Sequence, residues 1–379
     1  MTCLRVLFVI AAPSSADSAD VRRLLVLKSG LESWGVQTGI LYLGDYFLSS
    51  PQILLPVNIP HFLRLANSYD VVHATGFAAY AMGIAKYVGN FKLIWDIHSS
   101  SEEIRLPKKN LFNVTSNYSL LAWLIARQVT RKQADFFITV SEPLRQKLVQ
   151  LGIDKQRTGT IYNGVNVELF KPDEDRKENE TFTVTYAGGY QKWQGIENLV
   201  KAARILKDAQ IKFKMMGFKK ADMTMKDEVK RELEDRVELI DFLPGRRDDQ
   251  PKAFVDELCK SDVLVIPRYC NPRIPKYCDP KYVRKTFGWL STKFSEYIAT
   301  GRPVIVTALD VSAEFVEQYD CGFVCDPTPE SIAKTILEAK QTPPEELDKK
   351  GMNGRRLAET EFDLHVTGKK YFELLSKIA

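Results

Sequence analysis

The feature of this sequence that most constrains its fold is a regular alternation of short apolar runs with longer helical segments. In the first half, six runs are apolar and rich in β-branched residues: 5–10, 38–43, 70–74, 93–97, 135–140 and 158–162. Helical stretches, such as 21–34 and 142–151, separate these runs. Alternating strands and helices predict a parallel sheet that is covered by helices on both faces.

The same pattern starts again after an almost wholly charged segment, 172–180. The runs that predict a second sheet are 182–187, 211–215, 237–242, 263–267, 304–307 and 322–325. A chain of 379 residues is long enough for two domains. The predicted fold class is therefore α/β, with two Rossmann-like, doubly wound parallel-sheet domains that face a cleft. Ligands are expected beyond the carboxyl ends of the strands.

The composition is that of an ordinary globular protein, with 45% hydrophobic residues and a net charge of +5. This mild positive charge suits phosphorylated ligands and does not by itself call for nucleic acid. The six cysteines match no zinc pattern of the C-x2-C type, so free thiols in a reducing compartment are expected. The apolar start, 4–12, lacks the basic lead of a signal peptide. We therefore expect a cytoplasmic protein.

A short helix followed by a buried strand, over 291–306, carries the clearest functional signal. Ser291 or Thr292 supplies a hydroxyl that caps the start of the helix, and Gly301 ends it. The N-terminus of such a helix presents N–H groups and the positive end of the helix dipole. The stretch therefore predicts a site for an anion.

The segment before this helix, 268–290, shows no clear periodicity. It contains three prolines, two cysteines and six basic residues. Irregular segments of this length are usually functional or mobile. Two interpretations stay open, namely a flap over a bound ligand and a surface insertion.

Three blocks of sequence carry a resemblance to a known family. They are ADFFITVS with IYNGVNVELFKP (134–141 and 161–172), YAGGYQKWQGI (186–196) and STKFSEYIATGRPVIV (291–306). In this order they resemble GT-B glycosyltransferases, in particular glycosyltransferase family 4. The resemblance implies an N-terminal domain over 1–170 and a nucleotide-sugar-binding domain over 171–362. A C-terminal helix, 363–379, would cross back to the first domain.

The resemblance also implies the residues that bind the donor. Glu296 would accept hydrogen bonds from the ribose, and its alternative role is a surface acid that favours the helix dipole. The diphosphate would be held by Gly188, Gly189, Lys192, Ser291, Thr292 and Lys293. For each lysine the alternative is a solvated surface charge.

The chain departs from the family pattern at three positions near this predicted site. The first glutamate of the family's Glu-x7-Glu pattern falls on Gly288, and two usual cations fall on Gly189 and Gln194. A diphosphate leaving group without cations would be costly to stabilise. Lys192 and Lys293 are the nearest replacements in the sequence, and Arg268, Arg284 and Lys285 form a reserve.

Residues of the first domain are implicated on the acceptor side. His98 follows a predicted strand in WDIH, and histidine suits hydroxyl binding and proton transfer near neutral pH. The resemblance makes His98 a catalytic candidate together with Lys192 and Glu296, while a structural histidine is the alternative. Ser14 and Ser15 stand where many relatives have a glycine pair, and they bind ligand or cap a helix. Glu102 binds acceptor or begins a solvated loop.

The function implied is that of a retaining glycosyltransferase. It would move a hexose from a nucleotide diphosphate sugar to an acceptor hydroxyl, on a glycan or a lipid-linked molecule. The donor is a co-substrate, and neither a cofactor nor a metal is expected. Two alternatives stay open: a non-catalytic GT-B subunit that binds sugar nucleotides or a partner, and a sugar-nucleotide epimerase of the same fold. The missing glutamate and cations favour the first of these.

One apolar segment, SLLAWLIA over 119–126, lies among basic residues. These flanking residues are Arg105, Lys108, Lys109, Arg127, Arg131 and Lys132. Such a segment either anchors the protein peripherally at an anionic membrane surface or forms a core helix.

Overall fold

The computed structural model describes residues 4–14, 16, 18–46, 59–98, 114–176, 178–219, 222–241, 252–270 and 275–378. Contacts within the chain group it into two compact units. Unit 1 comprises Met1–Tyr162, Thr286–Trp289 and Leu364–Ala379, and unit 2 comprises Asn163–Lys285 and Leu290–Asp363. The segment 163–170, which the sequence pattern places in the first domain, therefore groups with unit 2.

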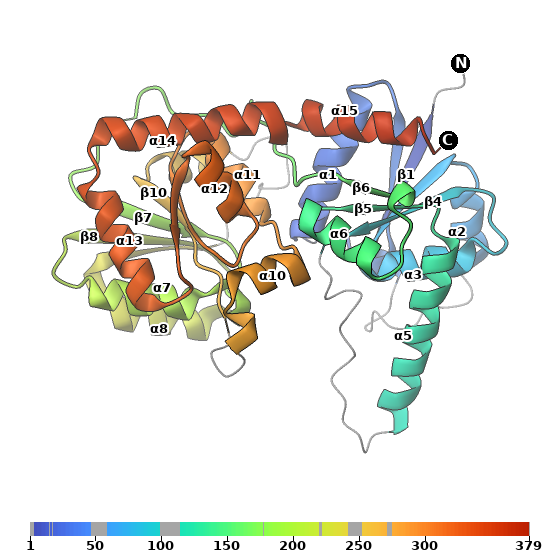
Figure 1. Ribbon diagram of the computed structural model, residues 1–379, viewed down its shortest axis with the longest axis horizontal. Coiled ribbons are helices and arrows are strands. Elements are labelled where there is room, and N and C mark those ends of the chain that lie inside the picture. Colours follow the sequence, from blue (N-terminus) through green and yellow to red (C-terminus); the bar gives the residue numbers. More distant parts are fainter. Residues whose placement is uncertain are drawn as a thin grey trace. The chain divides into compact units, whose positions relative to one another are not determined.

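Unit 1 is built on a six-stranded parallel sheet with the order β2-β1-β3-β4-β5-β6 (Figure 1). Its strands are β1 (Arg5–Ile10), β2 (Gln37–Tyr42), β3 (Val71–Thr75), β4 (Lys92–Ile97), β5 (Phe136–Thr139) and β6 (Thr158–Thr160). Each lies within a residue or two of its predicted position. The buried, β-branched runs pair in parallel because helices connect them and cover both faces.

The helices of unit 1 are α1 (Ala19–Glu32), α2 (Ile59–Ala66), α3 (Gly76–Ala85), α5 (Val114–Gln133), α6 (Glu142–Gln150) and α15 (Leu364–Leu375). Short 3₁₀ turns add η1 (Leu43–Tyr46) and η3 (Lys155–Arg157). Side chains of β1, α1 and α15 share one core, with Phe8, Leu24 and Tyr371 among its members. α1 and α15 cross closely, because a Cβ on Gly30 would lie 3.0 Å from Cα of Gly368. The C-terminal helix thus groups with unit 1.

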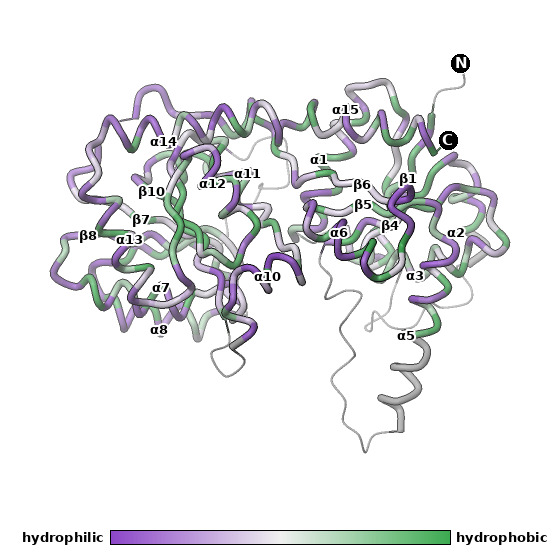
Figure 2. The backbone as a smooth tube through the Cα atoms, in the orientation of Figure 1, coloured by the Kyte–Doolittle hydropathy of each residue, from purple (hydrophilic) through white to green (hydrophobic). Residues whose placement is uncertain are grey.

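Unit 2 repeats the architecture with a second six-stranded parallel sheet, in the order β12-β11-β10-β7-β8-β9. Its strands are β7 (Phe182–Ala187), β8 (Ile211–Phe218), β9 (Val237–Asp241), β10 (Val263–Ile266), β11 (Val304–Thr307) and β12 (Gly322–Cys325). Figure 2 shows the strands of both sheets as largely hydrophobic stretches of the backbone tube. The two sheets confirm the predicted α/β fold of two Rossmann-like domains.

The helices of unit 2 are α7 (Ile196–Ile205), α8 (Met223–Leu233), α9 (Lys252–Cys259), α10 (Pro280–Phe287), α11 (Thr292–Ala299), α12 (Ser312–Tyr319), α13 (Pro329–Gln341) and α14 (Pro344–Leu357). The shorter elements are η4 (Lys192–Gln194), η6 (Glu234–Arg236), η7 (Pro275–Tyr277) and a π-helical turn, η8 (Ala358–Phe362). Helices α7, α8 and α13 pack with the sheet in one core that includes Leu199, Phe213 and Ile332.

The segment 268–290 is more ordered than its sequence suggested. Its described part contains η7 and α10, and Figure 2 shows α10 as hydrophilic. A disulfide joins Cys270 to Cys278, eight residues apart. The expectation that all cysteines are free thiols is therefore wrong for this pair, because the turn through η7 brings the two side chains together. Buried free thiols remain at Cys259, Cys321 and Cys325.

Within the described ranges, no helix combines the length and the apolar character needed to cross a membrane.

Candidate functional site

The strand order of unit 2 defines where a ligand is expected. From β7 the chain proceeds to β8 and β9 on one side, whereas β10, β11 and β12 lie on the other side. The point between β7 and β10 is thus the topological switch point, where loops diverge and leave a crevice at the carboxyl ends of the strands. The predicted donor residues come from the loop after β7 and from α11.

The loops that follow β7 and β10 touch at this point. The backbone N–H of Tyr269 donates to the Trp193 carbonyl at 3.3 Å. Gly195 has φ +84°, and a Cβ there would lie 1.6 Å from the Pro267 carbonyl oxygen. Only glycine accommodates this backbone conformation and contact. This glycine, which lies in the block 186–196 that carries the family resemblance, is therefore required by the packing of the two loops.

Helix α11 begins at the predicted residue. The Ser291 side chain accepts a hydrogen bond from the Lys293 backbone N–H at 3.3 Å and caps the helix, and Thr292 is its first residue. Gly301 follows the end of the helix with φ +70°, in the left-handed conformation favoured after a helix. The predicted punctuation of this helix is confirmed.

Lys293 extends from the first turn of α11 toward the loop after β7. Its Nζ donates to Oε1 of Gln194 at 2.9 Å and lies 5.4 Å from the centre of the Tyr186 ring. A Cβ on Gly188 would lie 2.1 Å from Cε of Lys293. The side chain reaches its position because residue 188 is glycine. Since Lys293 is buried, it is not the solvated surface lysine of the alternative interpretation.

Arg268 brings a second cation to the same switch point, from the end of β10. Its Nε donates to Asp310 at 2.8 Å, and its guanidinium lies 5.0 Å from the centre of the Trp193 ring. The buried Asp310 carboxylate also accepts the backbone N–H groups of Ser291 and Ser312 at 3.4 and 3.0 Å. Asp310 therefore ties Arg268 to the starts of α11 and α12.

Glu296 is only 6% exposed. It lies beyond the first turn of α11, so the alternative of an exposed first-turn acid is wrong. Lys192 lies in η4, but its side chain is outside the described part of the structure. Gly189 is near this turn, and its carbonyl accepts the Tyr186 hydroxyl at 2.5 Å.

The structure explains why residue 288 is not a glutamate. Gly288 has φ +58°, and a Cβ there would lie 2.6 Å from Cβ and 2.8 Å from the backbone nitrogen of Leu144. Its carbonyl accepts the Ser141 hydroxyl at 2.6 Å. Gly288 thus packs tightly on the start of α6, where any side chain at this position would clash.

Unit 1 has its own switch point, between β1 and β3, and His98 lies nearby at the end of β4. His98 Nε2 lies 3.0 Å from Asp96, and Nδ1 lies 2.7 Å from Asp20 in the first turn of α1. The Asp96 carboxylate also accepts hydrogen bonds from Nε and Nη2 of Arg23, at 2.8 and 3.0 Å. Nε2 of His73 lies 3.2 Å from the same carboxylate. Three charged or titratable side chains, Arg23, His73 and His98, therefore contact one buried carboxylate.

Burial and charge act in opposite directions on this cluster. Burial alone would raise the pKa of Asp96, but Arg23 and His98 hold it well below its ordinary value. Burial alone would lower the pKa of His98, but Asp96 and Asp20 raise it well above its ordinary value. Burial lowers the pKa of His73. His98 is therefore cationic near neutral pH, whereas His73 is neutral.

The other acceptor-side predictions are only partly described. The backbone N–H of Ser14 donates to Asp45 at 2.7 Å, so this loop is held by η1. Ser15 and Glu102 lie outside the described residues.

Comparisons with known proteins decide the family. The model of the family described as glycosyl transferases group 1 matches residues 168–357, half of the chain, and that of Glycosyltransferase Family 4 matches residues 8–169. The chain belongs to the glycosyl transferases group 1 family. It is thus a glycosyltransferase enzyme, and the predicted GT-B resemblance is confirmed.

Solved structures share the fold of this glycosyltransferase. The Anabaena protein HepE, in complex with UDP and glucose, superposes with a TM-score of 0.70 at 17% identity over 99% of this chain and 100% of its own. Sucrose-phosphate synthase from Thermosynechococcus elongatus gives 0.72 at 16% identity, with 99% of each chain covered. A glycosyltransferase from Rickettsia africae gives 0.71 at 17% identity, over 100% of this chain and 99% of its own.

One curated relative is an uncharacterized 41.2 kDa protein of the cps region of Klebsiella pneumoniae. It is 21% identical over 214 residues, and the match spans about half of each protein, 53% of this glycosyltransferase and 54% of the relative.

Several residues of the two switch points were not predicted as site residues. They are Asp20, Arg23, Asp96, Trp193 and Asp310. The signal that was available is a polar residue at the end of a buried strand, as Asp96 is in WDIH and Asp310 is in TALD. The partners of these residues lie far away in the sequence, so only the fold reveals them.

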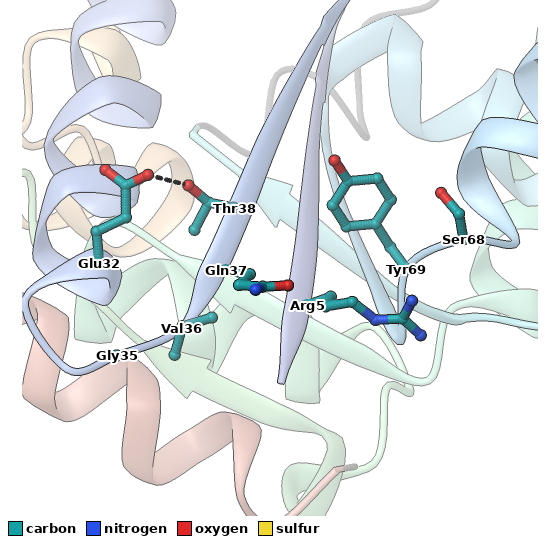
Figure 3. Close-up of a pocket in the computed structure, with 8 residues that line it drawn as sticks. All are labelled: Arg5, Glu32, Gly35, Val36, Gln37, Thr38, Ser68 and Tyr69. Atoms are coloured by element: carbon teal, nitrogen blue, oxygen red, sulfur yellow. Dashed lines mark hydrogen bonds between the residues drawn. The ribbon is translucent and has the colours of Figure 1, made fainter. Parts of the chain in front are cut away.

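Unit 1 of the glycosyltransferase also has an open cavity, of about 710 Å³, at the amino ends of its strands. Figure 3 shows Glu32 bonded to Thr38 at its wall, with Arg5 and Tyr69 opposite. Arg5 pairs with Asp70 at 2.8 Å. Because the cavity lies at the end of the sheet opposite the switch point, we do not assign it to the site.

Proposed function

We propose that this glycosyltransferase transfers a hexose from a nucleotide diphosphate sugar to an acceptor hydroxyl, with retention of the anomeric configuration, in the synthesis of a glycan or a glycolipid. The observation that carries the proposal is the approach of Lys293 and Arg268 to the glycine loop after β7, beside the start of α11. HepE, solved with UDP-glucose, has the same fold, so a UDP-sugar is the first donor to test.

The geometry suits a diphosphate leaving group. Negative charge develops on this group as the bond to the sugar breaks, and fixed charges that already point at it lower the barrier most. Lys293 is buried against Gly188, and it projects from the first turn of a helix whose dipole also favours an anion. Lys293 and Arg268 thereby replace the two cations that the family usually has at the positions of Gly189 and Gln194, and Gln194 instead positions Lys293.

Glu296 is assigned to the ribose of the donor. It is buried one turn beyond Lys293 on α11, at the position that the family resemblance gives to the glutamate that binds the ribose. Lys192, in η4 after the glycine loop, is assigned to the diphosphate or the transferred sugar.

The proposed reaction is a front-face displacement. The bond between the anomeric carbon and the phosphate oxygen breaks, and the acceptor oxygen bonds to the same face of the anomeric carbon. The acceptor proton passes to the departing phosphate oxygen. This scheme does not require the pair of carboxylates that glycosidases place across the scissile bond.

The proposal is tested by calorimetry with UDP, GDP and ADP. One of these nucleotides should bind, and Glu296→Gln should weaken its binding about ten- to a hundredfold, because a hydrogen bond to a charged group contributes roughly 1.5–3 kcal/mol. Glu330→Gln, in the exposed first turn of α13, is the matched control and should bind like the wild type. Unchanged affinity in Glu296→Gln would exclude the assigned ribose site.

Turnover distinguishes transfer from binding alone. Incubation with the matching nucleotide sugar and a panel of sugar and lipid-linked acceptors should release the nucleoside diphosphate. Activity should persist in EDTA, because Lys293, Arg268 and the start of α11, rather than a metal ion, neutralise the charge of the diphosphate in the proposed mechanism. Tight nucleotide binding with no turnover on any acceptor would favour the non-catalytic alternative.

A further inference from the structure

The buried cluster at the switch point of unit 1 determines its own proton positions. An ionised carboxylate only accepts hydrogen bonds, so each nitrogen that faces one must carry a proton. Nε2 of His98 faces Asp96 at 3.0 Å, and Nδ1 faces Asp20 at 2.7 Å. His98 therefore carries both protons and is an imidazolium.

The same accounting gives His73 the opposite state. Its Nε2 faces Asp96 at 3.2 Å and must donate, whereas its Nδ1 lies 2.6 Å from the Tyr371 hydroxyl. A neutral ring satisfies both contacts if the Tyr371 O–H donates to Nδ1. The cluster then holds two cations, Arg23 and His98, and two anions, Asp20 and Asp96, so its net charge is zero.

This arrangement leaves His98 poorly suited to bind substrate directly. Both ring nitrogens already donate to carboxylates, and the ring is largely buried. Asp20 differs, because its side chain is 55% exposed and only one of its oxygens, Oδ1, bonds the imidazolium. Asp20 also lies in the first turn of α1, where the N-cap Ser18 accepts the Val21 N–H, so its position is fixed by a capped helix.

We propose that Asp20 is the residue of unit 1 that binds a hydroxyl of the substrate sugar, and that His98, Asp96 and Arg23 are positioning residues that hold its carboxylate. This inference rests on the proposed function and moves the direct contact from His98, the predicted catalytic residue, to Asp20. Arg23 fixes the far side of Asp96 through its paired Nε and Nη2 contacts, and its Nη1 donates to the Ile161 and Tyr162 carbonyls at 2.9 and 3.0 Å. The chain Arg23, Asp96, His98 and Asp20 thus runs from the protein interior to an exposed side chain.

The first test measures the protonation of the His98 ring and does not require enzyme activity. The ring ¹⁵N shifts of His98 in the full chain should show both nitrogens protonated at neutral pH. In Asp20→Asn the ring should lose its second proton at a lower pH than in the wild type, because one of its two anions is removed. The groups that face the ring are Asp20 and Arg23 of α1, Asp96 of β4 and His73 of β3. A His98 ring that titrates identically in the two proteins would overturn the pairing.

The second test reads the contact with substrate. Asp20→Asn should lower kcat/KM about ten- to a hundredfold, as expected for loss of a hydrogen bond to a charged group, with unchanged nucleotide affinity. A rise in KM for the acceptor alone would assign the hydroxyl to the acceptor, and a rise for the nucleotide sugar alone would assign it to the transferred hexose. Asp20→Glu should restore part of the loss.

Glu32→Gln is the matched control, because Glu32 is a carboxylate at the other end of α1 that bonds Lys28 and Thr38. An Asp20→Asn enzyme with wild-type kcat/KM would overturn the proposed contact. If the wild-type protein binds no nucleotide, the proposed function fails, while the ¹⁵N experiment still decides the charge state of the cluster.

Discussion

At the scale of single residues, the candidate site of unit 2 depends on the space that glycines leave because they have no side chain. Lys293 occupies the space that a Cβ of residue 188 would fill, and Pro267 occupies the space beside Gly195. A glycine in such a loop therefore does more than permit a turn, because Gly188 leaves room for Lys293, a cation that this chain does not have at positions 189 and 194.

We predict that Gly188→Ala weakens nucleotide binding about tenfold by displacing Lys293. The added Cβ would lie 2.1 Å from Cε, at the flexible end of the lysine, so the side chain should move rather than the backbone. A double-mutant cycle in calorimetry checks the cause, since the alanine should have little further effect in a Lys293→Ala background. Equal losses in both backgrounds would show that the glycine acts otherwise.

The charged cluster of unit 1 predicts a defined pH dependence of stability. His98 has a folded-state pKa raised above its ordinary 6.5, so its stabilising effect is complete below about pH 6.5 and is lost as pH rises through the folded value. Asp20 and Asp96 have pKa values lowered below 3.8, so their effect is present above that pH and is lost on further acidification.

The loss of stability in His98→Gln should therefore be largest between about pH 4 and 6.5 and should shrink in alkaline solution. Urea unfolding across this range measures it. His365→Gln is the control, because His365 bonds the Ser33 hydroxyl at 3.1 Å. A difference from the wild type that grows with pH would contradict the assigned charges.

At the scale of elements, the loop before α11 is shaped by its contact with α6. Gly288 lies against Leu144, and Ser141 both caps α6 and donates to the Gly288 carbonyl. A glutamate at position 288 would therefore clash with Leu144.

We predict that Gly288→Ala destabilises the protein more than Gly152→Ala. Both glycines have positive φ, of 58° and 89°, so each alanine pays roughly 1–2 kcal/mol for the left-handed backbone. Gly152 has nothing within 4 Å of its added Cβ, whereas Gly288 meets Leu144, which should add about 1–3 kcal/mol. Denaturant unfolding of the two variants gives the difference directly. Equal losses would refute the packing explanation.

At the scale of the whole molecule, unit 1 exposes an apolar surface that a solvated enzyme does not need. Helix α3 has no charged residue, and its Phe77 is 67% exposed. Val88, just beyond the end of the helix, is 74% exposed. On the adjoining α5, Ile125 is 55% exposed, so the core-helix alternative is wrong for this residue. Lys132, two turns further on the same face, is also exposed. For most of the apolar segment 119–126, namely 119–123, the side chains are outside the described part of the structure.

We predict that this surface binds anionic membranes peripherally. Apolar side chains beside cations gain both burial and electrostatic attraction at such a surface. The protein should sediment with phosphatidylglycerol vesicles at low salt, and Phe77→Glu with Val88→Glu should reduce the bound fraction severalfold. Met352→Glu, at an exposed apolar position of α14, should bind like the wild type. A wild-type protein that stays in the supernatant would contradict the prediction.

The sequence by itself determined the elements and supplied most of the residues that we assign to the donor. Strand positions follow from short apolar runs, and the ends of α11 follow from Ser291 and Gly301, because burial periodicity and capping are local properties. Gly188, Lys293 and Glu296 were also predicted as donor residues, since they sit in contiguous motifs. The sequence did not predict η7 and α10 within 268–290, and it did not predict the disulfide. Cysteine pairing depends on how a turn orients the chain, which the sequence pattern does not show.

Only the tertiary structure decided which charges meet. Lys293 and Gln194 are 99 residues apart, His98 and Asp20 are 78 apart, and Arg268 and Asp310 are 42 apart. Such pairs form because parallel strands bring the ends of distant segments to one edge of a sheet, and no local pattern records which partner stands there. The sequence therefore identified His98 as a candidate, while the fold showed that carboxylates hold both its nitrogens and that the side chain of Asp20 is exposed.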